Sequence, residues 1–272
     1  MTPLSDATRA GVWLQAVREL FDKEDRIYNL ILEVQQPGAA TPASRAIEQH
    51  VDNFLRNYDC QPNHTVAETI FPAAEYVRGG LDAVLAYPTT VYPVIQPVPA
   101  NRWGTYALRI TERKCSDGST FRPLEALIDK LRRQLAQKAP KRAVYELDLM
   151  SEPLDLKLYE ADVDRKNALG GQCLSHLSFK LGPNRELYLT AIYRYQWFVQ
   201  KALGNLLGLA RLQDCVAREV GISVGPLVCH ATLAILEDEK VQKGTWDRAA
   251  LEKLIGRCEQ SLTVAETEEA VA

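Results

Sequence analysis

The chain lacks an excess of either charge and has no long apolar run. Its net charge is −3 and its pI is near 5.9, whereas a general nucleic-acid-binding protein needs surplus Lys and Arg to displace the counterions of the phosphate backbone. No apolar run approaches the roughly 18 residues that a membrane-spanning helix requires. Residues 1–6 also lack the basic start and apolar run of a signal peptide. The sequence therefore predicts neither general nucleic-acid binding nor a membrane partner.

Paired cysteine motifs are also missing. The six cysteines are Cys60, Cys115, Cys173, Cys215, Cys229 and Cys258. None belongs to a C-x-x-C pair, so their spacing signals neither a ribbon-type zinc site nor a redox dithiol. Reduced thiols are typical of intracellular proteins, and we therefore expect a cytoplasmic protein without disulfides.

Glycine-rich phosphate loops of the standard spacings and internal repeats are absent as well. The 272 residues, of which 46% are hydrophobic, are enough for a large core without disulfide or metal cross-links. Helical and strand-like periods alternate irregularly, and the clearest pair of neighbouring strands is a hairpin. This order predicts an α+β fold with a mixed sheet and helices packed on it, not a doubly wound parallel sheet.

Hydrophobic periodicity predicts the individual elements. Helices are expected at 6–24, 44–58, 121–137, 199–219 and 246–262. Strands are expected at 27–36, 143–149, 177–181 and 187–194, and again after Gly225. Six prolines interrupt residues 60–101; because proline lacks the backbone donor that helices and inner strands use, we predict a long folded-over loop there. Residues 151–171 are expected to form a second loop, and 263–272 a frayed tail.

Two finer predictions concern the first helix and the first strand. Ser5 or Asp6 is the expected helix cap, since short polar side chains accept hydrogen bonds from the first helical turn. In the strand, Tyr28 and the apolar residues that alternate after it are expected to share one face. These apolar residues are Leu30, Leu32 and Val34.

The residues able to carry chemistry gather between 172 and 237. Cys173 stands just before the hairpin, and Arg194 closes the return strand. A cysteine attacks as the thiolate, and a nearby cation lowers its pKa. Arg194 could supply that cation or bind a phosphate through its planar fork. Alternatively, Cys173 is a small buried hydrophobe and Arg194 a surface arginine.

Further candidates for ligand binding are Asn205, Lys141 and Arg142. Asn205 lies at the entry to an apolar helix, where its carboxamide could read the edge of a pyrimidine or simply cap the helix. Lys141 and Arg142 follow a helix end at Pro140. Their charges could bind a phosphate or offset the helix dipole.

A short turn-like element at 103–109 could bring Tyr106 and Arg109 towards a pocket. The alternative is a core tyrosine and an exposed arginine. Cys173 and His176 form a Cys-x-x-His spacing, and Cys229-His230 is the candidate for the other half of a metal site. Adjacent residues on a strand point to opposite faces, however, so we predict no metal there.

Together, residues from about Ile128 to Glu237 resemble the thymidylate synthase superfamily, which includes pyrimidine nucleotide hydroxymethylases. Cys173 falls at the family's nucleophile, Arg194 at a phosphate-binding arginine, and Asn205 at the asparagine that reads the pyrimidine.

Lys141 and Arg142 fall where the family has two arginines that reach across the dimer to the partner's nucleotide phosphate. Tyr106, after Gly104, is similar to an upstream Gly-x-x-Tyr element. Glu68 and Glu75 are candidates, by position, for the family's catalytic glutamate.

The resemblance implies a thymidylate synthase-like fold in a single domain over 1–272, with helices packed on one side of a mixed β-sheet and a sheet face used for dimerisation. The divergent N-terminal part, with its proline-rich loops, spans 1–100, the best-matching core 120–240 and the tail 264–272. The implied activity is that of a methyltransferase or hydroxymethyltransferase: transfer of a one-carbon unit to C5 of a pyrimidine nucleotide by a homodimer. The implied cofactor is 5,10-methylenetetrahydrofolate.

The chain also departs from the family pattern. The Pro-Cys-His of the nucleophile is Gln172-Cys173-Leu174, and the serine after the phosphate arginine is Tyr195. The aspartate near the folate is Trp197, and the histidine and tyrosine that contact the sugar are Ile235 and Glu237.

Three hypotheses follow from this mixture. The chain is a divergent transferase, or a non-catalytic homologue that serves as a nucleotide-binding or assembly subunit. In the third, the nucleophile acts on a modified or larger nucleotide, whose base could stack on Tyr195 and Trp197.

Overall fold

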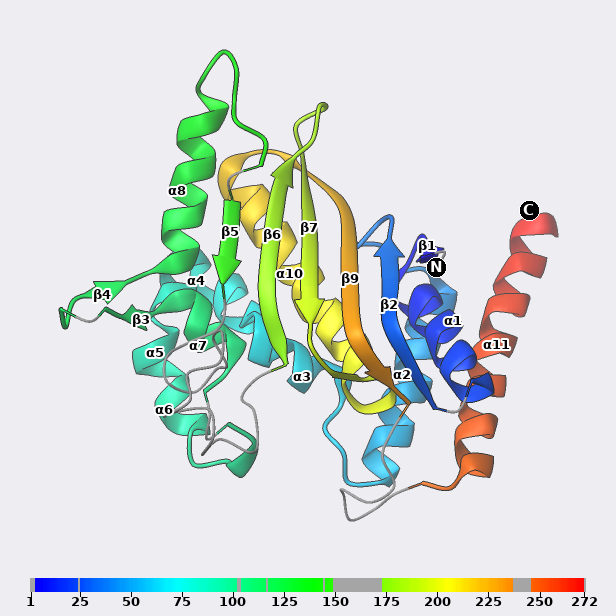
Figure 1. Ribbon diagram of the computed structural model, residues 1–272. Coiled ribbons are helices and arrows are strands. Elements are labelled where there is room, and N and C mark those ends of the chain that lie inside the picture. The colour runs from blue at the N-terminus through cyan, green and yellow to red at the C-terminus, as the bar shows by residue number, and fades with distance from the viewer. Residues whose placement is uncertain are drawn as a thin grey trace.

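The computed structural model describes residues 3–23, 25–101, 104–115, 117–143, 145–148, 173–236 and 246–271. Within these ranges, seven strands form one mixed sheet, and helices pack against it (Figure 1). The strand order is β1-β2-β9-β7-β6-β5, with β8 paired to β9. The predicted α+β class and mixed sheet are thus confirmed.

The strands bear out the predicted hairpin. The sheet contains β1 (Leu4–Asp6), β2 (Arg26–Val34), β5 (Tyr145–Asp148), β6 (Leu174–Leu181), β7 (Glu186–Tyr193), β8 (Gln196–Trp197) and β9 (Ser223–Ile235). β3 (Arg113–Lys114) and β4 (Thr120–Phe121) pair separately. β6 and β7 are antiparallel, whereas β7 and β9 are parallel. Because parallel neighbours need a crossover connection, the chain passes through a helix between them.

The helices occupy more of the chain than the sequence predicted. They are α1 (Arg9–Asp22), α2 (Pro42–Asn57), α3 (Asn63–Ile70), α4 (Ala73–Leu85), α5 (Tyr87–Thr90), α6 (Tyr92–Ile95), α7 (Tyr106–Thr111), α8 (Pro123–Leu135), α10 (Leu203–Val220) and α11 (Arg248–Val271). A 3-10 turn, η1 (Pro99–Asn101), follows α6, and a π-helical turn, η2 (Phe198–Ala202), leads into α10. None of the described helices is long and apolar enough to cross a membrane.

The first helix starts later than predicted. Thr8 is its cap: the Thr8 hydroxyl accepts a hydrogen bond of 3.0 Å from the backbone N–H of Gly11. Asp6 lies in β1 and accepts from the Thr8 backbone N–H at 2.8 Å. The prediction of Ser5 or Asp6 as the cap was therefore wrong, because both residues are taken up by the edge strand.

The predicted face of β2 is correct except at Tyr28. Leu30, Leu32 and Val34 are buried, but Tyr28 is 62% exposed. Asn29 has a φ of 57° and is skipped in the pairing of β2 with β9. The register of β2 with β9 is the same on both sides of Asn29, so no residue is inserted; instead, the left-handed backbone at Asn29 interrupts the extended strand, and Tyr28 before it does not lie on the buried face.

The proline-rich segment is helical, and the prediction of a long loop over 60–101 was wrong. Pro62 and Pro72 precede the first residues of α3 and α4, and Pro88 and Pro93 lie in the first turns of α5 and α6. The missing N–H of proline costs nothing at these positions, because the first turn of a helix has no internal acceptor for it. These four prolines therefore mark helix starts.

The last helix also continues through most of the predicted tail, up to Val271. Its buried residues are Leu251, Leu254, Ile255 and Cys258. Their spacing of three and four residues forms one apolar stripe, which packs on α2. No proline or glycine follows in 263–271 to end the helix.

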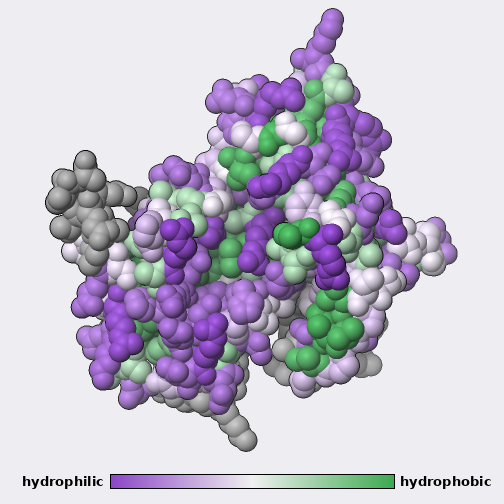
Figure 2. All heavy atoms as spheres, turned by 180° about the vertical axis from the view of Figure 1, so that it is seen from behind, coloured by the Kyte–Doolittle hydropathy of each residue, from purple (hydrophilic) through white to green (hydrophobic). Residues whose placement is uncertain are grey.

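The sheet has two different faces. On one face, the apolar side chains of β6 and β7 are buried beneath helices such as α10, which runs behind the strands in Figure 1. On the other, which we call the open sheet face, no described helix crosses the strands (Figure 1). Its side chains are only half-buried and include Ser178, Lys180, Thr190, Ile192 and Val228. Figure 2 shows the side opposite to that of Figure 1, where hydrophobic residues gather in small, separated patches among hydrophilic ones.

Two glycines allow α3 to lie directly against α10. A Cβ atom on Gly204 would come within 2.6 Å of the Val66 Cβ, and one on Gly208 within 2.8 Å of the Ala67 carbonyl oxygen. Only a residue without a side chain fits at these contacts. Glu68 of α3 accepts a hydrogen bond of 3.0 Å from Arg211 of α10 across this contact.

Candidate functional site

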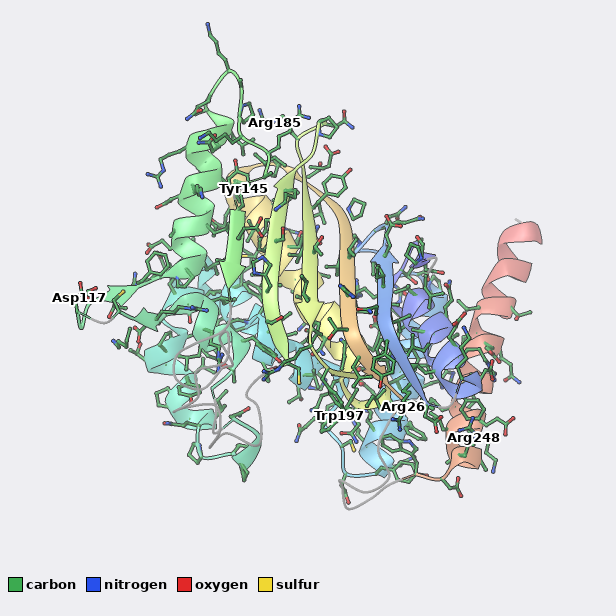
Figure 3. All side chains as sticks on the ribbon, in the orientation of Figure 1. Arg26, Asp117, Tyr145, Arg185, Trp197 and Arg248 are labelled. Carbon is green, nitrogen blue, oxygen red and sulfur yellow. The ribbon has the colours of Figure 1, made fainter. Side chains whose placement is uncertain are left out.

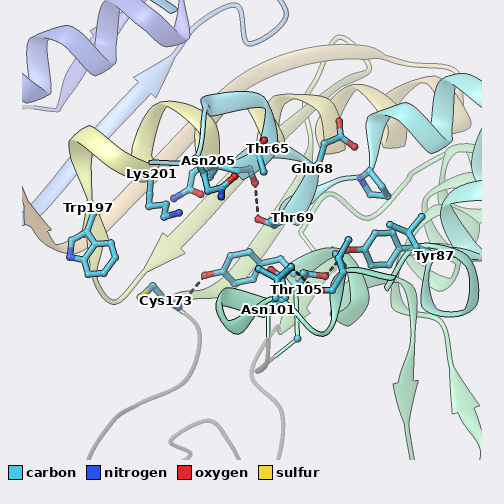
Figure 4. A pocket seen from close by; sticks show the side chains of 18 of the residues that line it. Thr65, Glu68, Thr69, Tyr87, Asn101, Thr105, Cys173, Trp197, Lys201 and Asn205 are labelled. Atoms are coloured by element: carbon cyan, nitrogen blue, oxygen red, sulfur yellow. Dashed lines mark hydrogen bonds between the residues drawn. The ribbon is translucent and has the colours of Figure 1, made fainter. Parts of the chain in front are cut away.

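A cavity of about 580 Å³ lies between α3, the start of α10, α7 and the first residues of the hairpin (Figure 4). It is lined by three of the predicted site residues, namely Tyr106, Cys173 and Asn205. These come from three separate parts of the chain, and only the tertiary structure brings them together. The cavity is therefore the candidate functional site.

Cys173 is held at the cavity by a tyrosine. The Tyr106 hydroxyl oxygen accepts hydrogen bonds from the backbone N–H groups of Cys173, at 3.0 Å, and Leu174, at 2.9 Å. Tyr106 is the first residue of α7, a helix rather than the predicted turn, and Thr105 caps this helix through Leu108 N–H. Burial raises the pKa of Tyr106, so its hydroxyl stays neutral.

Arg194 acts on the Cys173 thiol from outside the cavity. Its backbone N–H donates to the Cys173 carbonyl oxygen at 2.9 Å, and its own carbonyl oxygen accepts from Thr232 Oγ1 at 2.8 Å. Burial raises the pKa of the Cys173 thiol, and the Arg194 charge lowers it only in part. The Arg194 charge thus lowers the pKa of the thiol, as predicted. Burial raises the pKa by more, so the resting thiol is neutral.

Asn205 is not a helix cap. Ala202 occupies the cap position of α10, and Asn205 is the third helical residue. Its side chain is 6% exposed and lines the cavity. A buried carboxamide of this kind is suited to a ligand that both donates and accepts hydrogen bonds.

Both glutamates named as candidates line the cavity. Glu68 accepts a hydrogen bond of 3.0 Å from the Arg211 side chain, while Glu75 pairs with Arg78. Burial raises the pKa of Glu68, although the Arg211 charge opposes it. Glu68 therefore holds a proton to higher pH than an ordinary glutamic acid does.

Lys141 and Arg142 do not reach this cavity. Both are exposed and lie before β5, where the Arg142 carbonyl oxygen accepts from the Leu181 N–H at 3.1 Å. Leu181 ends β6, and Cys173 precedes the start of the same strand. Eight residues of extended chain place the two ends about 26 Å apart. Figure 3 shows this separation, with Tyr145 near one end of the sheet and Trp197 near the other.

Arg109 was expected to approach the pocket beside Tyr106. It is buried within α7 and is 7% exposed, but it does not line the cavity. Trp103, at the start of the same predicted element, lies outside the described residues, as do 151–171 and Gln172.

Four further residues, from the end of β7 to β8, line the cavity. The third hypothesis had named Tyr195 and Trp197 as stacking residues, whereas the sequence pattern did not single out Tyr193 and Gln196. Tyr193 and Gln196 are almost fully buried, and Tyr193 Oη and Gln196 Nε2 have no hydrogen-bond partner in the described part of the chain. Tyr195 and Trp197 contact each other through a hydrogen bond of 2.9 Å from Trp197 Nε1 to Tyr195 Oη. In the sequence, the dense run of aromatic residues around Arg194 could have indicated this part of the cavity wall.

The histidines considered for a metal site are engaged elsewhere. His176 contacts Glu146 at 2.9 Å, and His230 contacts Asn29 at 3.1 Å. Cys229 is buried beside Gln196. No cluster of three His, Cys, Asp or Glu side chains in the described ranges is arranged to hold a metal ion.

The cavity therefore combines a thiol, a carboxamide and a carboxyl of raised pKa. Such a set can attack a ring carbon, hold the edge of the ring and move a proton. Neither a scan against protein-family models nor a search of curated proteins gave a match to this chain.

Proposed function

We propose that this chain is a thymidylate synthase-like transferase that adds a one-carbon unit to C5 of a pyrimidine nucleotide through Cys173. The observation that carries this proposal is that Cys173 and Asn205 line one cavity together with Glu68. These are the nucleophile, the pyrimidine-reading asparagine and a candidate glutamate of the resemblance. The cavity volume of about 580 Å³ falls within the range of small-molecule sites.

In the proposed reaction, the Cys173 thiolate forms a bond to C6 of the ring. The C5–C6 double bond opens, and the negative charge spreads to C5 and the C4 carbonyl oxygen. Asn205 holds the ring edge through its donor and its acceptor, and Glu68 supplies a proton near that oxygen. C5 would then form a bond to the one-carbon unit while the bonds of that unit to the donor nitrogens break, each nitrogen keeping the electron pair. Water would add to the unit to give a hydroxymethyl group, or a hydride from the donor would give a methyl group. Loss of the C5 proton and departure of the Cys173 thiolate restore the double bond.

The lining of the cavity supports the proposal of a flat one-carbon donor. Tyr87, Val91, Ile95 and Val98 form an apolar side of it, and Trp197 adds an indole ring. These residues would hold 5,10-methylenetetrahydrofolate, which supplies the one-carbon unit when bound. Trp197 stands where the resemblance places an aspartate, so the donor's polar edge would be held differently.

We further propose that two copies of the chain pair through the open sheet face, within a thymidylate synthase-like fold. The half-buried side chains of this face are partly apolar, including Ile192 and Val228. Pairing would also give exposed Lys141 and Arg142 a role, because they lie at the end of the sheet away from their own cavity. They would reach the nucleotide phosphate bound by the partner.

Intact-protein mass spectrometry tests the reaction. The protein is incubated with 5-fluoro-pyrimidine nucleotides (uracil and cytosine, ribo and deoxyribo), with and without methylenetetrahydrofolate. We expect a mass increase that Cys173→Ala abolishes; its dependence on base, sugar and folate identifies the substrate and donor. An adduct that persists in Cys173→Ala, or no adduct with any of these nucleotides, would contradict the proposal.

One observation favours a non-catalytic nucleotide-binding subunit as the second candidate. Burial raises the pKa of Cys173 despite Arg194, so the unliganded cavity holds a neutral thiol. A thiol is a much weaker nucleophile than a thiolate. Nucleotide binding by calorimetry without any adduct, unchanged in Cys173→Ala, would support this candidate over the transferase.

A further inference from the structure

The cavity has one basic residue among its described lining residues, Lys201. Arg194 influences the thiol but does not line the cavity, and Lys141 and Arg142 lie at the other end of the sheet. A nucleotide bound to a single chain would therefore meet one cationic side chain, and that side chain was not singled out by the sequence pattern.

Lys201 is placed by an unusual local structure. It belongs to the π-helical turn η2, whose residues Phe198, Val199 and Ala202 are buried. The Phe198 carbonyl oxygen accepts a hydrogen bond of 2.7 Å from the buried indole N–H of Trp13. Because a π-helical turn inserts an extra residue, it changes which side chains face a given direction. Here it leaves Lys201 on the cavity side of a well-anchored turn.

Lys201 lies at the Cys173 end of the cavity. Figure 4 shows Lys201 between Trp197 and Asn205, at the same end of the cavity as Cys173, whereas Glu68 and Tyr87 lie farther along. The indole N–H of Trp197 is occupied by Tyr195, so Trp197 offers its ring to a ligand. An aromatic ring, a carboxamide and an ammonium group thus line one end of the cavity.

We infer that Lys201 is a ligand-binding residue of this cavity and that its ammonium group binds an anionic oxygen group of the ligand. Lysine binds such groups as a compact point charge with three donors. The inference extends the proposed function to a specific contact with the ligand. It rests on the proposed function for the choice of the two anions that we consider. These are the 5′-phosphate of the nucleotide and a carboxylate of the one-carbon donor.

Isothermal titration calorimetry with three variants tests the inference. Lys201→Met removes the charge but keeps an unbranched side chain, and Lys201→Arg keeps the charge. Lys253→Met is the matched control, because Lys253 is exposed on α11, far along the chain from the cavity. The ligands are pyrimidine nucleoside 5′-monophosphates, the corresponding nucleosides, and tetrahydrofolate with and without its glutamate.

If the phosphate is the anion, Lys201→Met weakens binding of the monophosphates about tenfold or more. It leaves nucleoside binding unchanged, Lys201→Arg retains most of the affinity, and Lys253→Met behaves like the wild type. If the carboxylate is the anion, the loss appears only with the glutamate-bearing folate. Equal affinities of Lys201→Met and the wild type for every ligand would overturn the inference.

A separate measurement distinguishes failure of the inference from failure of the proposed function. If the wild type binds neither nucleotides nor folates, inorganic phosphate is added during thermal unfolding. Stabilisation of the wild type and of Lys253→Met, but not of Lys201→Met, would support the anion site and refute the nucleotide assignment. Absence of stabilisation in the wild type would refute the anion site as well.

Discussion

At the scale of single residues, the site depends on how Cys173 is held. Its backbone and that of Leu174 share one acceptor, the Tyr106 hydroxyl oxygen. Its thiol is influenced by two opposing effects, burial and the charge of Arg194. One tyrosine therefore sets the position of the thiol, and one arginine moderates its acidity.

Replacing Tyr106 by Phe should destabilise the fold and mobilise the nucleophile. The change removes the acceptor of two backbone N–H groups, and an unsatisfied buried donor costs about 1–3 kcal/mol. Urea unfolding measures the stability, and the alkylation rate of Cys173 by iodoacetamide reports its position. Tyr87→Phe is a suitable comparison, because the Tyr87 hydroxyl bonds the Thr105 side chain and no backbone N–H. Unchanged stability in Tyr106→Phe would show that this hydroxyl does not anchor the strand.

Alkylation of Cys173 should become faster with rising pH, beyond the range of an ordinary thiol. Burial raises the thiol pKa, so the thiolate accumulates only at higher pH, and Arg194 limits this rise. Arg194→Ala should therefore raise the pKa further and shift the rate profile to higher pH, whereas Arg194→Lys should shift it less. A profile with a midpoint below that of a free thiol, or one that Arg194→Ala does not move, contradicts this expectation.

At the scale of elements, the cavity is built from helices that approach unusually closely. α3 and α10 meet at Gly204 and Gly208, and the buried Gln213 side chain of α10 donates to the Leu187 and Gly225 carbonyl oxygens at 2.7 and 2.9 Å. The irregular pairing of β7 with β9 leaves these carbonyl oxygens available. α10 therefore links the sheet, α3 and the cavity wall.

Gly208→Ala should destabilise the protein and disturb the cavity. The new methyl group would lie 2.8 Å from the Ala67 carbonyl oxygen and from the Ile70 Cβ, so α3 would have to move. Overpacking of this kind costs about 1–3 kcal/mol, which urea unfolding measures. Gly256→Ala in α11 is the matched control, because no atom lies within 4 Å of its added Cβ. That control should be neutral or more stable by up to about 1 kcal/mol, and equal behaviour of the two variants would refute the packing argument.

At the scale of the whole molecule, the open sheet face is polar at one side and partly apolar at its centre. Glu146 of β5 accepts hydrogen bonds from His176, Ser178 and Lys180 of β6. Although burial acts against it, these hydrogen bonds lower the pKa of Glu146, so the carboxylate remains charged. Apolar Ile192 and Val228 lie on the neighbouring strands β7 and β9.

Val228→Lys should prevent the proposed pairing of two chains without unfolding either. Val228 lies opposite Glu33 in the β2–β9 register, so a lysine there gains an acidic neighbour within the chain. In the dimer, the added charge would be buried against the partner. Light scattering after size exclusion should give a dimer for the wild type and a monomer for the variant, with unchanged circular dichroism. A monomeric wild type would refute the dimer and, with it, the proposed role of Lys141 and Arg142.

Local sequence pattern was sufficient to predict many of the helices and strands of this protein. The strands at β2, β5, β6 and β7 and the helices α2 and α8 follow from hydrophobic periodicity, because burial of one face leaves its period in the sequence. Local sequence pattern gave wrong predictions where the effect of a residue on the backbone depends on its place within a helix or strand. Four prolines of 60–101 lie at helix starts, and the left-handed backbone at Asn29 interrupts its strand.

The sequence by itself determined the element types in the core and pointed to Cys173, Asn205 and Tyr106. Only the tertiary structure decided that these three share one cavity and that Lys141 and Arg142 lie outside it. It also showed Lys201 and Glu68 at the cavity wall. The physical reason is that periodicity records which face of an element is buried, whereas a binding site depends on the side chains that distant elements place together when they pack.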